Sequence, residues 1–546
     1  EGSILGMEPL EPVVFGEYWE GVFSSKQWVN GRMRRQSDLP PPLDLFATLG
    51  TAWKSADGPV TPDASVRLSV RAQSILDLTE RLTRFLEEDV GLPVEFGTVV
   101  LARIPDGAIV SVAEVGERRN RGRSSILERV APGSAVKPLL AAAVLSQRPE
   151  LGSMEIPARS GKISSVLGMP RVGGRRAFTT ALNCGVPREG TVDLRYFLRC
   201  SNNEYAASLL VAGLAEDGVP GESWRGASEI PLEGGRVPRG VLLRSPLSEG
   251  VSALFDLPTD PTIADTRRRS SRVWQGLAFS DGTPFQAPAE VLPAESRPAL
   301  LAPGSSEGTD LGLLYRYAYG AWENQWTLLD LTNAFARVVS DRRIHLTFAP
   351  GAGDGVGEEA GGRDGGDGPG VHGGGAGRPD GGGSERGGRR WDGSGPGSDG
   401  GEGGRYRGEG RSREETLGVV GQPWYPRFLS GLRAVAVDGT ARGLGEAWVD
   451  QGLPRAFYTK TGTLNEAGQP GPQDDLFAKA LLFAVGNPAH GADGPLSCGF
   501  VGGLYLRFAQ GPASGNLPSY QVDFAREHLG AFLRENWEVF GGCSGR

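Results

Sequence analysis

A glycine-rich stretch constrains the fold of this chain more than any other feature. Residues 351–410 contain 28 glycines in 60 positions, interleaved with Asp, Glu and Arg. Such a segment cannot bury enough apolar surface to offset the conformational entropy that is lost on ordering. We therefore predict a disordered insertion over about 351–413, with folded structure resuming near Glu414. A phosphate-binding loop is disfavoured, because the strand–loop–helix context and the GKS or GKT ending are missing.

The remaining sequence is rich enough in apolar residues to form a large core. The chain has 546 residues, of which 39% are hydrophobic, so a sizeable interior can be buried. The formal net charge of −8 gives no indication of a nucleic-acid partner. No apolar run reaches the roughly 18 residues of a membrane-spanning helix, and no signal peptide is recognisable. Because the sequence begins with Glu1 rather than methionine, we expect an upstream anchor or domain that is absent from this chain.

The pattern of apolar residues predicts secondary structure from about residue 66 onward. Residues 1–65 are mixed in pattern and are interpreted as a linker or a small packing segment. After them, Leu76, Leu78, Leu82 and Phe85 can share one face of a helix. Further predicted elements are a hairpin around "PDG" at 97–115, two helices over 192–214 with a polar break at Ser201–Asn203, a helix over 326–339, strands over 457–464, 476–486 and 500–508, and an amphipathic helix over 521–540. Residues 218–310 are too weakly periodic to assign.

The spacing of cysteines and histidines does not indicate a metal centre. The cysteines are Cys184, Cys200, Cys498 and Cys543, and no two of them form a CxxC pair, so a zinc site is not expected. They allow three complete disulfide pairings, and the sequence does not choose among them. For Cys200 the simplest interpretation is a small buried residue. Four histidines are present, so a Ser-His-Asp triad stays open as an alternative, although it has no local signature such as GxSxG.

Lysine is used sparingly in this chain. Only six of the 57 basic residues are lysines, and one of them, Lys137, lies in "PGSAVKP". An arginine keeps its proton in a protein, whereas a buried or crowded lysine can lose it. Pro and Gly precede Ser134 and an apolar run follows, which places Ser134 at a helix start, where the positive helix end favours negative charge.

Ser134 and Lys137 are three residues apart, so they share one helix face. A serine nucleophile needs an adjacent base, and a neutral lysine can serve as one. Taken alone, however, the pattern is better explained by an ordinary helix start with a surface lysine.

Two further short patterns have both a structural and a functional interpretation. "SNN" at 201–203 offers a hydroxyl and two amides in a break between helices, and taken alone it is better explained as a helix N-cap. "KTGT" at 460–463 places a cation, two hydroxyls and a glycine on a strand. That set can form a carboxylate pocket, with Gly462 allowing another backbone or a ligand to come close. It can equally be an edge strand on which an exposed lysine prevents pairing with a strand of another molecule.

The three patterns together are much more specific than any one of them. Ser-x-x-Lys, Ser-x-Asn and Lys-Thr-Gly, in this order, form the signature set of penicillin-binding proteins and serine β-lactamases. The chain resembles the transpeptidase domain of a penicillin-binding protein over about 66–510, apart from 218–310 and the insertion. "GTVVLARIPDGAIVSVAEV" is similar to the opening hairpin of that family, and "GLRAVAVDGTARG" is similar to the segment that leads into "KTGT".

The resemblance implies a fold and a catalytic set. The fold would be of the α+β class, an antiparallel five-stranded sheet flanked by helices with a mostly helical subdomain, here formed by residues 66–546. Ser134 would be the acylated nucleophile and Lys137 its general base, although the identity of the base is disputed in part of this superfamily. Lys460 would be the nearby cation that lowers the pKa of Lys137. Ser201 would bridge the two lysines and pass a proton to the leaving amine.

The resemblance also implies how the substrate binds. The backbone N–H groups of Ser134 and Thr463 would form the oxyanion hole, and Asn203 would hold an amide of the substrate. Lys460 would act with Thr461 and Thr463 on the free carboxylate. The implied substrate-binding residues are Asn203, Thr461, Gly462 and Thr463. No metal and no organic cofactor is implied.

The implied activity is that of a peptidoglycan D,D-transpeptidase in the periplasm or another extracytoplasmic space. Its partners would be stem peptides ending in D-Ala-D-Ala, β-lactams and other cell-wall synthesis proteins, and not nucleic acid. The membrane anchor would lie in a segment that is absent from this chain. A D,D-carboxypeptidase or a serine β-lactamase is the alternative within the same chemistry, although no convincing glutamate for deacylation is found. A non-catalytic β-lactam sensor or a scaffold for wall synthesis is the alternative of another class.

Overall fold

The computed structural model describes most of the chain outside the glycine-rich region. The described residues are 13–14, 27–29, 32–34, 65–66, 68–104, 106–116, 124–157, 171–172, 175–176, 184, 190–214, 233, 236–258, 272–277, 287, 292–298, 300, 307–321, 324–349, 416–465, 477–489, 491, 493–509 and 518–543. The chain divides into a unit formed by Glu1–Gly353 and Glu415–Arg546 and a unit formed by Asp354–Glu414. All described residues belong to the first unit, so the predicted insertion at 351–413 lies outside them, as does most of the predicted segment 1–65.

A five-stranded sheet forms the centre of the first unit. Its strand order is β16-β17-β18-β5-β6, and every neighbouring pair is antiparallel. The five strands are β5 (Val94–Ile104), β6 (Ile109–Gly116), β16 (Ala456–Asn465), β17 (Phe477–Pro488) and β18 (Leu496–Phe508). The predicted antiparallel five-stranded sheet is therefore confirmed. Strand β16, which carries "KTGT", lies at one edge.

The two faces of the sheet contact two different hydrophobic cores. On β17, Leu481, Phe483 and Val485 belong to one core, whereas Ala480, Leu482 and Ala484 belong to the other. This alternation follows from the geometry of a strand, in which successive side chains point to opposite faces. Because both faces are buried, β17 is almost uniformly apolar, as expected for a strand that is covered on both sides.

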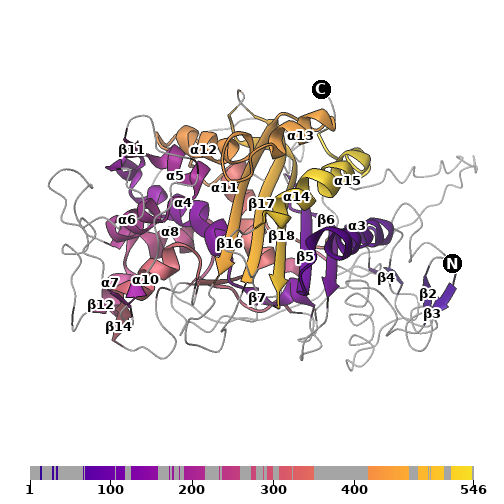
Figure 1. Cartoon of the computed structure of the whole chain (residues 1–546), viewed down its shortest axis with the longest axis horizontal. Helices are drawn as coiled ribbons and strands as arrows, with labels where there is room; N and C mark the ends of the chain where they lie inside the picture. Colours follow the sequence, from indigo (N-terminus) through magenta and orange to yellow (C-terminus); the bar gives the residue numbers. More distant parts are fainter. Residues whose placement is uncertain are drawn as a thin grey trace, which may run out of the picture. The chain divides into compact units, whose positions relative to one another are not determined.

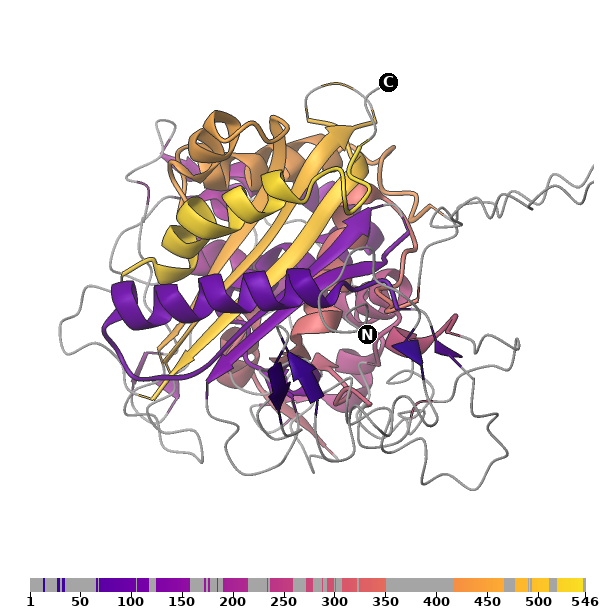
Figure 2. The same cartoon turned by 90° about the vertical axis from the view of Figure 1, so that its right-hand side faces the viewer.

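Helices from both ends of the chain cover one face of the sheet. Figure 2 shows α3 and the C-terminal helices lying across the strands on this side. The covering elements are α3 (Ala72–Phe85), the π-helical turn η2 (Leu86–Val90), α13 (Leu444–Asp450), α14 (Tyr520–Phe524), the π-helical turn η10 (Ala525–Leu529) and α15 (Gly530–Glu535). The predicted face of α3 is confirmed for Leu78, Leu82 and Phe85, which are buried in this core. It is wrong for Leu76, which is partly buried and packs against the other core.

The opposite face of the sheet contacts a helical subdomain. Its central helix is α4 (Lys137–Gln147), which is buried from its first residue to Leu145. A helix that is apolar on all sides belongs in the interior. The helices around it are α5 (Leu194–Cys200), α6 (Asn203–Leu214), α7 (Arg239–Leu243), α8 (Pro246–Phe255), α10 (Leu311–Ala318), α11 (Leu328–Ser340) and α12 (Tyr425–Val437), most of which are labelled in Figure 1.

The shorter elements connect these helices and strands. They are β1 (Val13–Val14), β2 (Gln27–Val29), β3 (Arg32–Arg34), β4 (Ser65–Val66), η3 (Ser125–Leu127), β7 (Arg129–Val130), η4 (Gly133–Val136), η5 (Pro149–Ser153), β8 (Ile156–Pro157), β9 (Arg171–Val172), β10 (Arg175–Arg176), β11 (Thr191–Val192), β12 (Arg236–Pro238), η8 (Arg272–Trp274), β13 (Arg297–Pro298), β14 (Gly308–Asp310) and β15 (Asn324–Thr327). None of the helices among the described residues is long and apolar enough to cross a membrane.

Two predicted boundaries differ from the structure. The helix expected over 326–339 is α11, which begins at Leu328 because the Thr327 hydroxyl caps it, accepting a hydrogen bond from the N–H of Asp330 at 3.1 Å. The helix expected over 521–540 is interrupted by η10 and ends at Glu535. The hairpin at 97–115 and the helix pair over 192–214 are confirmed.

Candidate active site

Ser134 lies in a tight turn that leads into the central helix. The turn, η4, spans Gly133–Val136, and α4 continues from Lys137 without a break. Ser134 therefore precedes the α-helix by one 3-10 turn, a small correction to its expected place at the helix start. Gly133 has a φ of 54°, and its N–H donates to the carbonyl oxygen of Gly320 at 3.0 Å. Glycine adopts this left-handed backbone at little cost, which fixes the turn that carries Ser134.

Lys137 is fully buried, which excludes the interpretation as a surface lysine. Its Nζ donates hydrogen bonds to the carbonyl oxygen of Ser201 at 2.7 Å, to Ser201 Oγ at 3.2 Å and to Asn203 Oδ1. All three of these partners come from the second motif. The structure therefore brings the first two motifs together through one amine.

Ser201 occupies the predicted break between two helices. It ends α5 with a left-handed backbone of φ 58° and ψ 43°, and α6 begins at Asn203. The helix-cap interpretation holds for the residue between them, because Asn202 Oδ1 accepts a hydrogen bond from the N–H of Tyr205 at 2.8 Å. Capping is thus done by Asn202, while Ser201 and Asn203 contact Lys137.

Lys460 brings the third motif to the same hydroxyl. It is fully buried, and its Nζ donates to Ser201 Oγ at 3.0 Å and to the carbonyl oxygen of Thr461 at 2.8 Å. Strand β16 is indeed an edge strand, but a buried lysine cannot prevent another strand from pairing with that edge. Ser201 Oγ therefore lies between two buried lysine amines.

Gly462 allows the edge strand to lie directly against the turn of Ser134. A Cβ atom at this position would come within 2.4 Å of the Pro132 carbonyl oxygen and within 2.9 Å of the Ala135 nitrogen. Those distances are below any normal contact, so a side chain would push the strand and the turn apart. The expectation that Gly462 permits a close approach is borne out for the backbone of residues 132–135.

The two threonines of "KTGT" have hydroxyl partners outside the motif. The hydroxyls of Thr461 and Thr440 form a hydrogen bond of 2.6 Å. Thr463 Oγ1 accepts a hydrogen bond of 3.2 Å from the amine of Lys479, which lies opposite it on β17. Both threonines thus lie beside polar groups that sequence analysis did not assign to the site.

Burial lowers the pKa of both central lysines, and the charge of Lys460 lowers that of Lys137 further. Burial, together with the neighbouring charge of Lys460, holds the pKa of Lys137 well below the usual value of a lysine. Burial lowers the pKa of Lys460 to about 7. Two ammonium groups that share one hydroxyl cannot both stay charged without a large cost in free energy. At neutral pH, therefore, a neutral amine is available at this site.

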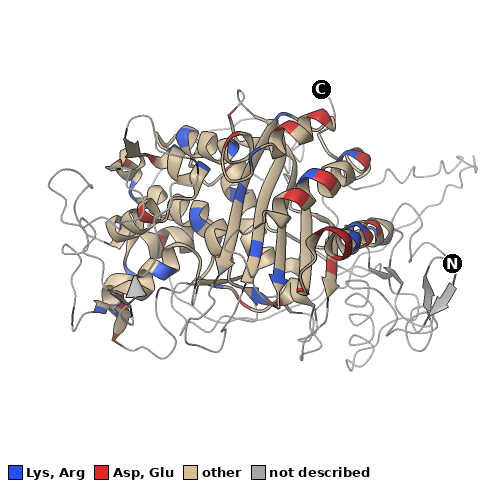
Figure 3. Cartoon of the chain, viewed as in Figure 1, with Lys and Arg blue, Asp and Glu red and all other residues tan. Residues whose placement is uncertain are grey.

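A cleft of about 720 Å³ opens beside these groups. Ser134, Ser201, Asn203, Thr461 and Thr463, all predicted as site residues, line it. The other lining residues are Cys184, Asp438, Gly439, Thr440, Arg442, Lys479, Ser519, Gln521, Val522 and Arg526. Figure 3 shows that strands β16, β17 and β18 carry basic residues and no acidic ones.

The sequence motifs did not identify Lys479, Gln521 or the loop from 438 to 442, all of which line the cleft. Strand pairing brings Lys479 beside Thr463, and pairing partners could not be read from the sequence. The scarcity of lysine was the one signal that could have singled out Lys479. The structure also settles the cysteine pairing as Cys184–Cys200 and Cys498–Cys543.

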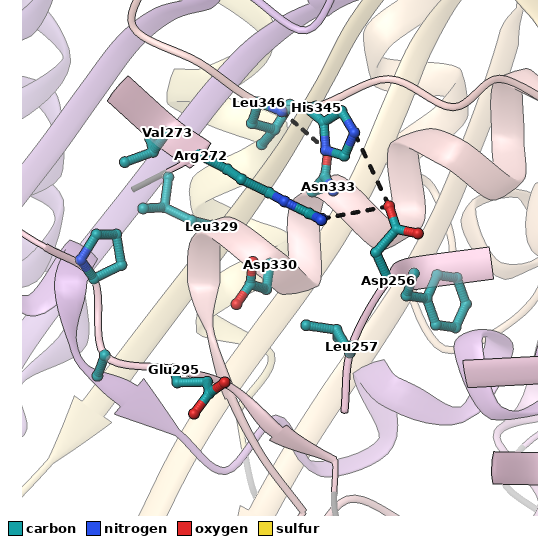
Figure 4. A pocket seen from close by; sticks show the side chains of 13 residues that line it. Asp256, Leu257, Arg272, Val273, Glu295, Leu329, Asp330, Asn333, His345 and Leu346 are labelled. Carbon is teal, nitrogen blue, oxygen red and sulfur yellow. Dashed lines mark hydrogen bonds and ion pairs between the residues drawn. The ribbon is translucent and has the colours of Figure 1, made fainter. Parts of the chain in front are cut away.

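A second, much smaller pocket lies outside this site. Its volume is about 50 Å³, and Asp256, Arg272, Asp330 and His345 are among its lining residues. Figure 4 shows Arg272 and His345 directed toward the carboxylate of Asp256. A cavity of this size holds a few water molecules at most. None of the predicted site residues lines it, so it is not a candidate for the substrate site.

Comparisons with known proteins gave matches only among solved structures. No protein-family model matches the chain, and no curated protein matches it in sequence. A peptidoglycan glycosyltransferase from Burkholderia ambifaria aligns with a TM-score of 0.45 at 12% identity, covering 88% of this chain and 99% of the other. The TP domain of penicillin-binding protein 3 from Burkholderia pseudomallei aligns with a TM-score of 0.46 at 12% identity, covering 89% and 98%. Penicillin-binding protein 2B from Streptococcus pneumoniae aligns with a TM-score of 0.48 at 12% identity, covering 87% and 60%.

Proposed function

We propose that this protein is a peptidoglycan D,D-transpeptidase that works through an acyl-serine intermediate on Ser134. β-Lactams would acylate the same serine. The observation that carries the proposal is the position of Ser201 Oγ, which lies 3.2 Å from the amine of Lys137 and 3.0 Å from that of Lys460. Both amines are fully buried, and Ser134 and Ser201 line one cleft.

The hydrogen bonds of Lys137 are suited to a neutral amine that acts as a base. The carbonyl oxygen of Ser201 and Asn203 Oδ1 can only accept hydrogen bonds. A neutral Lys137 has two N–H groups, and it would use both of them on these two acceptors. Its lone pair would then be left to accept a proton from a hydroxyl group, either that of Ser201 or that of Ser134.

Acylation would proceed by transfer of the Ser134 proton to Lys137. The Ser134 oxygen would attack the carbonyl carbon before the terminal D-Ala, and the C–N bond would then break. The backbone N–H groups of Ser134 and Thr463 would stabilise the oxyanion, a contribution of about 3 to 4 kcal/mol per donor in known cases. Thr463 lies on the edge strand of the sheet, and the turn that carries Ser134 packs against the backbone of this strand.

Ser201 would return the proton to the leaving amine. Its hydroxyl can receive a proton from one lysine while it donates its own to the nitrogen that departs. A second amine, on a neighbouring peptide, would then attack the acyl-serine, and the C–O bond would break as Ser134 regains its proton. Asn203 would hold an amide of the substrate, and Thr461 and Thr463 would hold its free carboxylate.

The two disulfides support an extracytoplasmic location. The bonds Cys184–Cys200 and Cys498–Cys543 account for all four cysteines. Such bonds persist in oxidising compartments and are rare in the cytosol. We therefore place the enzyme on the outer side of the cytoplasmic membrane, where stem peptides and other wall-synthesis proteins would be its partners.

Product analysis distinguishes this proposal from its alternatives. The chain would be incubated with a peptide ending in D-Ala-D-Ala and an amine acceptor, and the products would be identified by mass spectrometry. We expect release of D-Ala and a peptide joined to the acceptor. A hydrolysed peptide alone would indicate a carboxypeptidase, and loss of a penicilloyl adduct within seconds would indicate a β-lactamase. Penicillin labelling without any peptide turnover would indicate a sensor or a scaffold.

We also expect a bell-shaped dependence of acylation on pH. As pH rises, Lys137 loses its proton first and becomes a base, so kcat/KM increases. A further rise removes the proton of Lys460, whose pKa burial lowers to about 7, and the rate falls as that cation is lost. The apparent pKa values of the two limbs belong to the coupled pair of lysines and not to either lysine alone.

The alkaline limb can be assigned with one variant. In Lys460→Arg the cation cannot lose its proton, so the decline at high pH should disappear while the acid limb remains. Stopped-flow acylation by a chromogenic β-lactam from pH 5 to 10 measures both limbs. An unchanged alkaline limb in this variant would show that Lys460 is not the group whose charge is required.

A further inference from the structure

A disulfide forms part of the wall of the cleft, directly beside one of the proposed catalytic residues. Cys184 is partly buried and lines the cleft together with Ser201. Its partner, Cys200, is 1% exposed and is the last residue of α5, so the cross-link ends one residue before Ser201. Neither cysteine of the second disulfide, Cys498–Cys543, is among the residues that line the cleft. The wall of the cleft therefore contains a covalent bond that a reductant can break.

Ser201 has a backbone conformation that its surroundings must maintain. Its φ of 58° and ψ of 43° are left-handed, and a residue with a Cβ adopts such a conformation only at a cost in free energy. It persists where neighbouring contacts over-determine it. In the proposed mechanism this conformation matters, because it places Ser201 Oγ 3.2 Å from the amine of Lys137 and 3.0 Å from that of Lys460. A displacement of about 1 Å would break these contacts and can cost about 100-fold in rate.

Contacts on two sides hold the end of α5, which leads into Ser201. On one side is the disulfide at Cys200. On the other side is the loop from 438 to 442, which follows α12, the helix that packs beside α5 (Figure 1). Arg199 forms an ion pair with Asp438 at 3.2 Å, and the carbonyl oxygen of Arg199 accepts a hydrogen bond from the N–H of Thr440 at 3.3 Å. Because Asp438 is exposed and exposed ion pairs contribute little, the covalent bond is the firmest of these restraints.

We propose that the Cys184–Cys200 disulfide positions Ser201 and makes acyl transfer sensitive to the redox state of the surroundings. The inference rests on the proposed acyl transfer, in which Ser201 passes a proton to the leaving amine. The oxidised protein is the active form. Reduction by a dithiol frees the end of α5 and lowers turnover, and reoxidation restores it. Cys184 and Cys200 are positioning residues in this account, because they act through Ser201.

The reduction proceeds by thiol–disulfide exchange from the cleft. The first thiolate of the dithiol attacks Sγ of Cys184, which is the more accessible sulfur, and the bond to Cys200 breaks as Cys200 leaves as a thiolate. The second thiolate of the dithiol then attacks the mixed disulfide and releases Cys184. The dithiol is oxidised to a disulfide, and its electrons and protons pass to the two cysteines. Arg442, Lys479 and Arg526 also line the cleft, and their positive charge favours the approach of a thiolate.

The second disulfide provides a control of the same chemistry. Both Cys498 and Cys543 are partly exposed, so a reductant can reach this bond as well. A disulfide is expected to stabilise a protein more when it closes a longer loop, and the sequence separations are 45 residues for Cys498–Cys543 and 16 residues for Cys184–Cys200. General stabilisation would therefore depend more on the second disulfide, whereas positioning of Ser201 depends only on the first.

Reversible reduction of the native protein tests the inference. Dithiothreitol would be added to the folded protein, D-Ala release from a peptide ending in D-Ala-D-Ala would be measured, and the thiols in a parallel sample would be alkylated and mapped by mass spectrometry. We expect kcat to fall by about tenfold or more while KM stays within about threefold, and oxidised dithiothreitol to restore kcat. A Cys184–Cys200 bond that stays intact under reductant, or a native kcat after its reduction, would overturn the inference.

Two double variants separate positioning from stabilisation. Cys184→Ser combined with Cys200→Ser should have a low kcat that dithiothreitol does not change. Cys498→Ser combined with Cys543→Ser should lose more thermal stability, keep the native kcat and remain sensitive to dithiothreitol. An equal loss of kcat in the two double variants would make the first disulfide a general stabiliser and overturn the inference, with acyl transfer left intact. If the oxidised native protein released no D-Ala at all, the proposed function would fail, and this inference with it.

Discussion

Replacing Lys137 with arginine will abolish acylation of Ser134 while the protein still folds. A guanidinium keeps its proton at any accessible pH, so it cannot take the proton of the serine hydroxyl. General base catalysis contributes about 10²- to 10⁴-fold to rate, and we expect a loss of at least about 100-fold in the rate of β-lactam acylation. The readout is the second-order acylation rate constant.

Arginine at this position can still donate to the acceptors that surround it. The carbonyl oxygen of Ser201 and Asn203 Oδ1, both partners of Lys137, remain available to a cation. Circular dichroism and thermal unfolding would verify that the fold is retained, because α4 is the buried centre of the helical subdomain. Acylation at the native rate in Lys137→Arg would mean that another group is the base.

Removing the hydroxyl of Ser201 is expected to have the second large effect. Ser201 Oγ is the atom that connects the amines of Lys137 and Lys460. Without it, the leaving amine has no hydroxyl to protonate it, and we expect peptide turnover to fall by about 100-fold or more. The measurement is the rate of D-Ala release from a peptide substrate.

Two substitutions separate this chemical role from the unusual backbone of Ser201. The residue has a φ of 58°, which costs any residue with a Cβ, serine and alanine alike, about 1 to 2 kcal/mol but costs glycine little. Ser201→Ala therefore removes only the hydroxyl and leaves the backbone cost of the native serine unchanged, whereas Ser201→Gly also removes the Cβ and relieves that cost. We expect both variants to lose activity and neither to lose stability through backbone strain. Retained turnover in Ser201→Gly would show that the Ser201 hydroxyl does not transfer a proton to the leaving amine.

The fold was predictable where short-range patterns determine it. The hairpin of β5 and β6 and the strands β16, β17 and β18 could be identified from apolar runs bounded by turn residues. Residues 218–310 could not be assigned, because the described helices there are short: α7 has five residues and α8 has ten. Such helices are held by packing, as where Gly250 of α8 lies against the backbone of Ala143, and that packing leaves little periodicity in the sequence.

The candidate site was predictable only through motifs. Burial of Lys137 and Lys460 depends on contacts between residues 64 and 259 positions apart in the chain, which local patterns do not encode. The position of Lys479 beside Thr463 in the cleft depends on the pairing of β16 with β17. Likewise, the pairing of Cys184 with Cys200 follows from tertiary structure and not from spacing.

The central claim is that Ser134 is the residue that becomes acylated. The direct test is to label the protein with a fluorescent penicillin, digest it and identify the modified residue by mass spectrometry. We predict a single adduct on the peptide that contains Ser134, and no labelling of Ser134→Ala. An adduct on another residue, or undiminished labelling of that variant, would contradict the account.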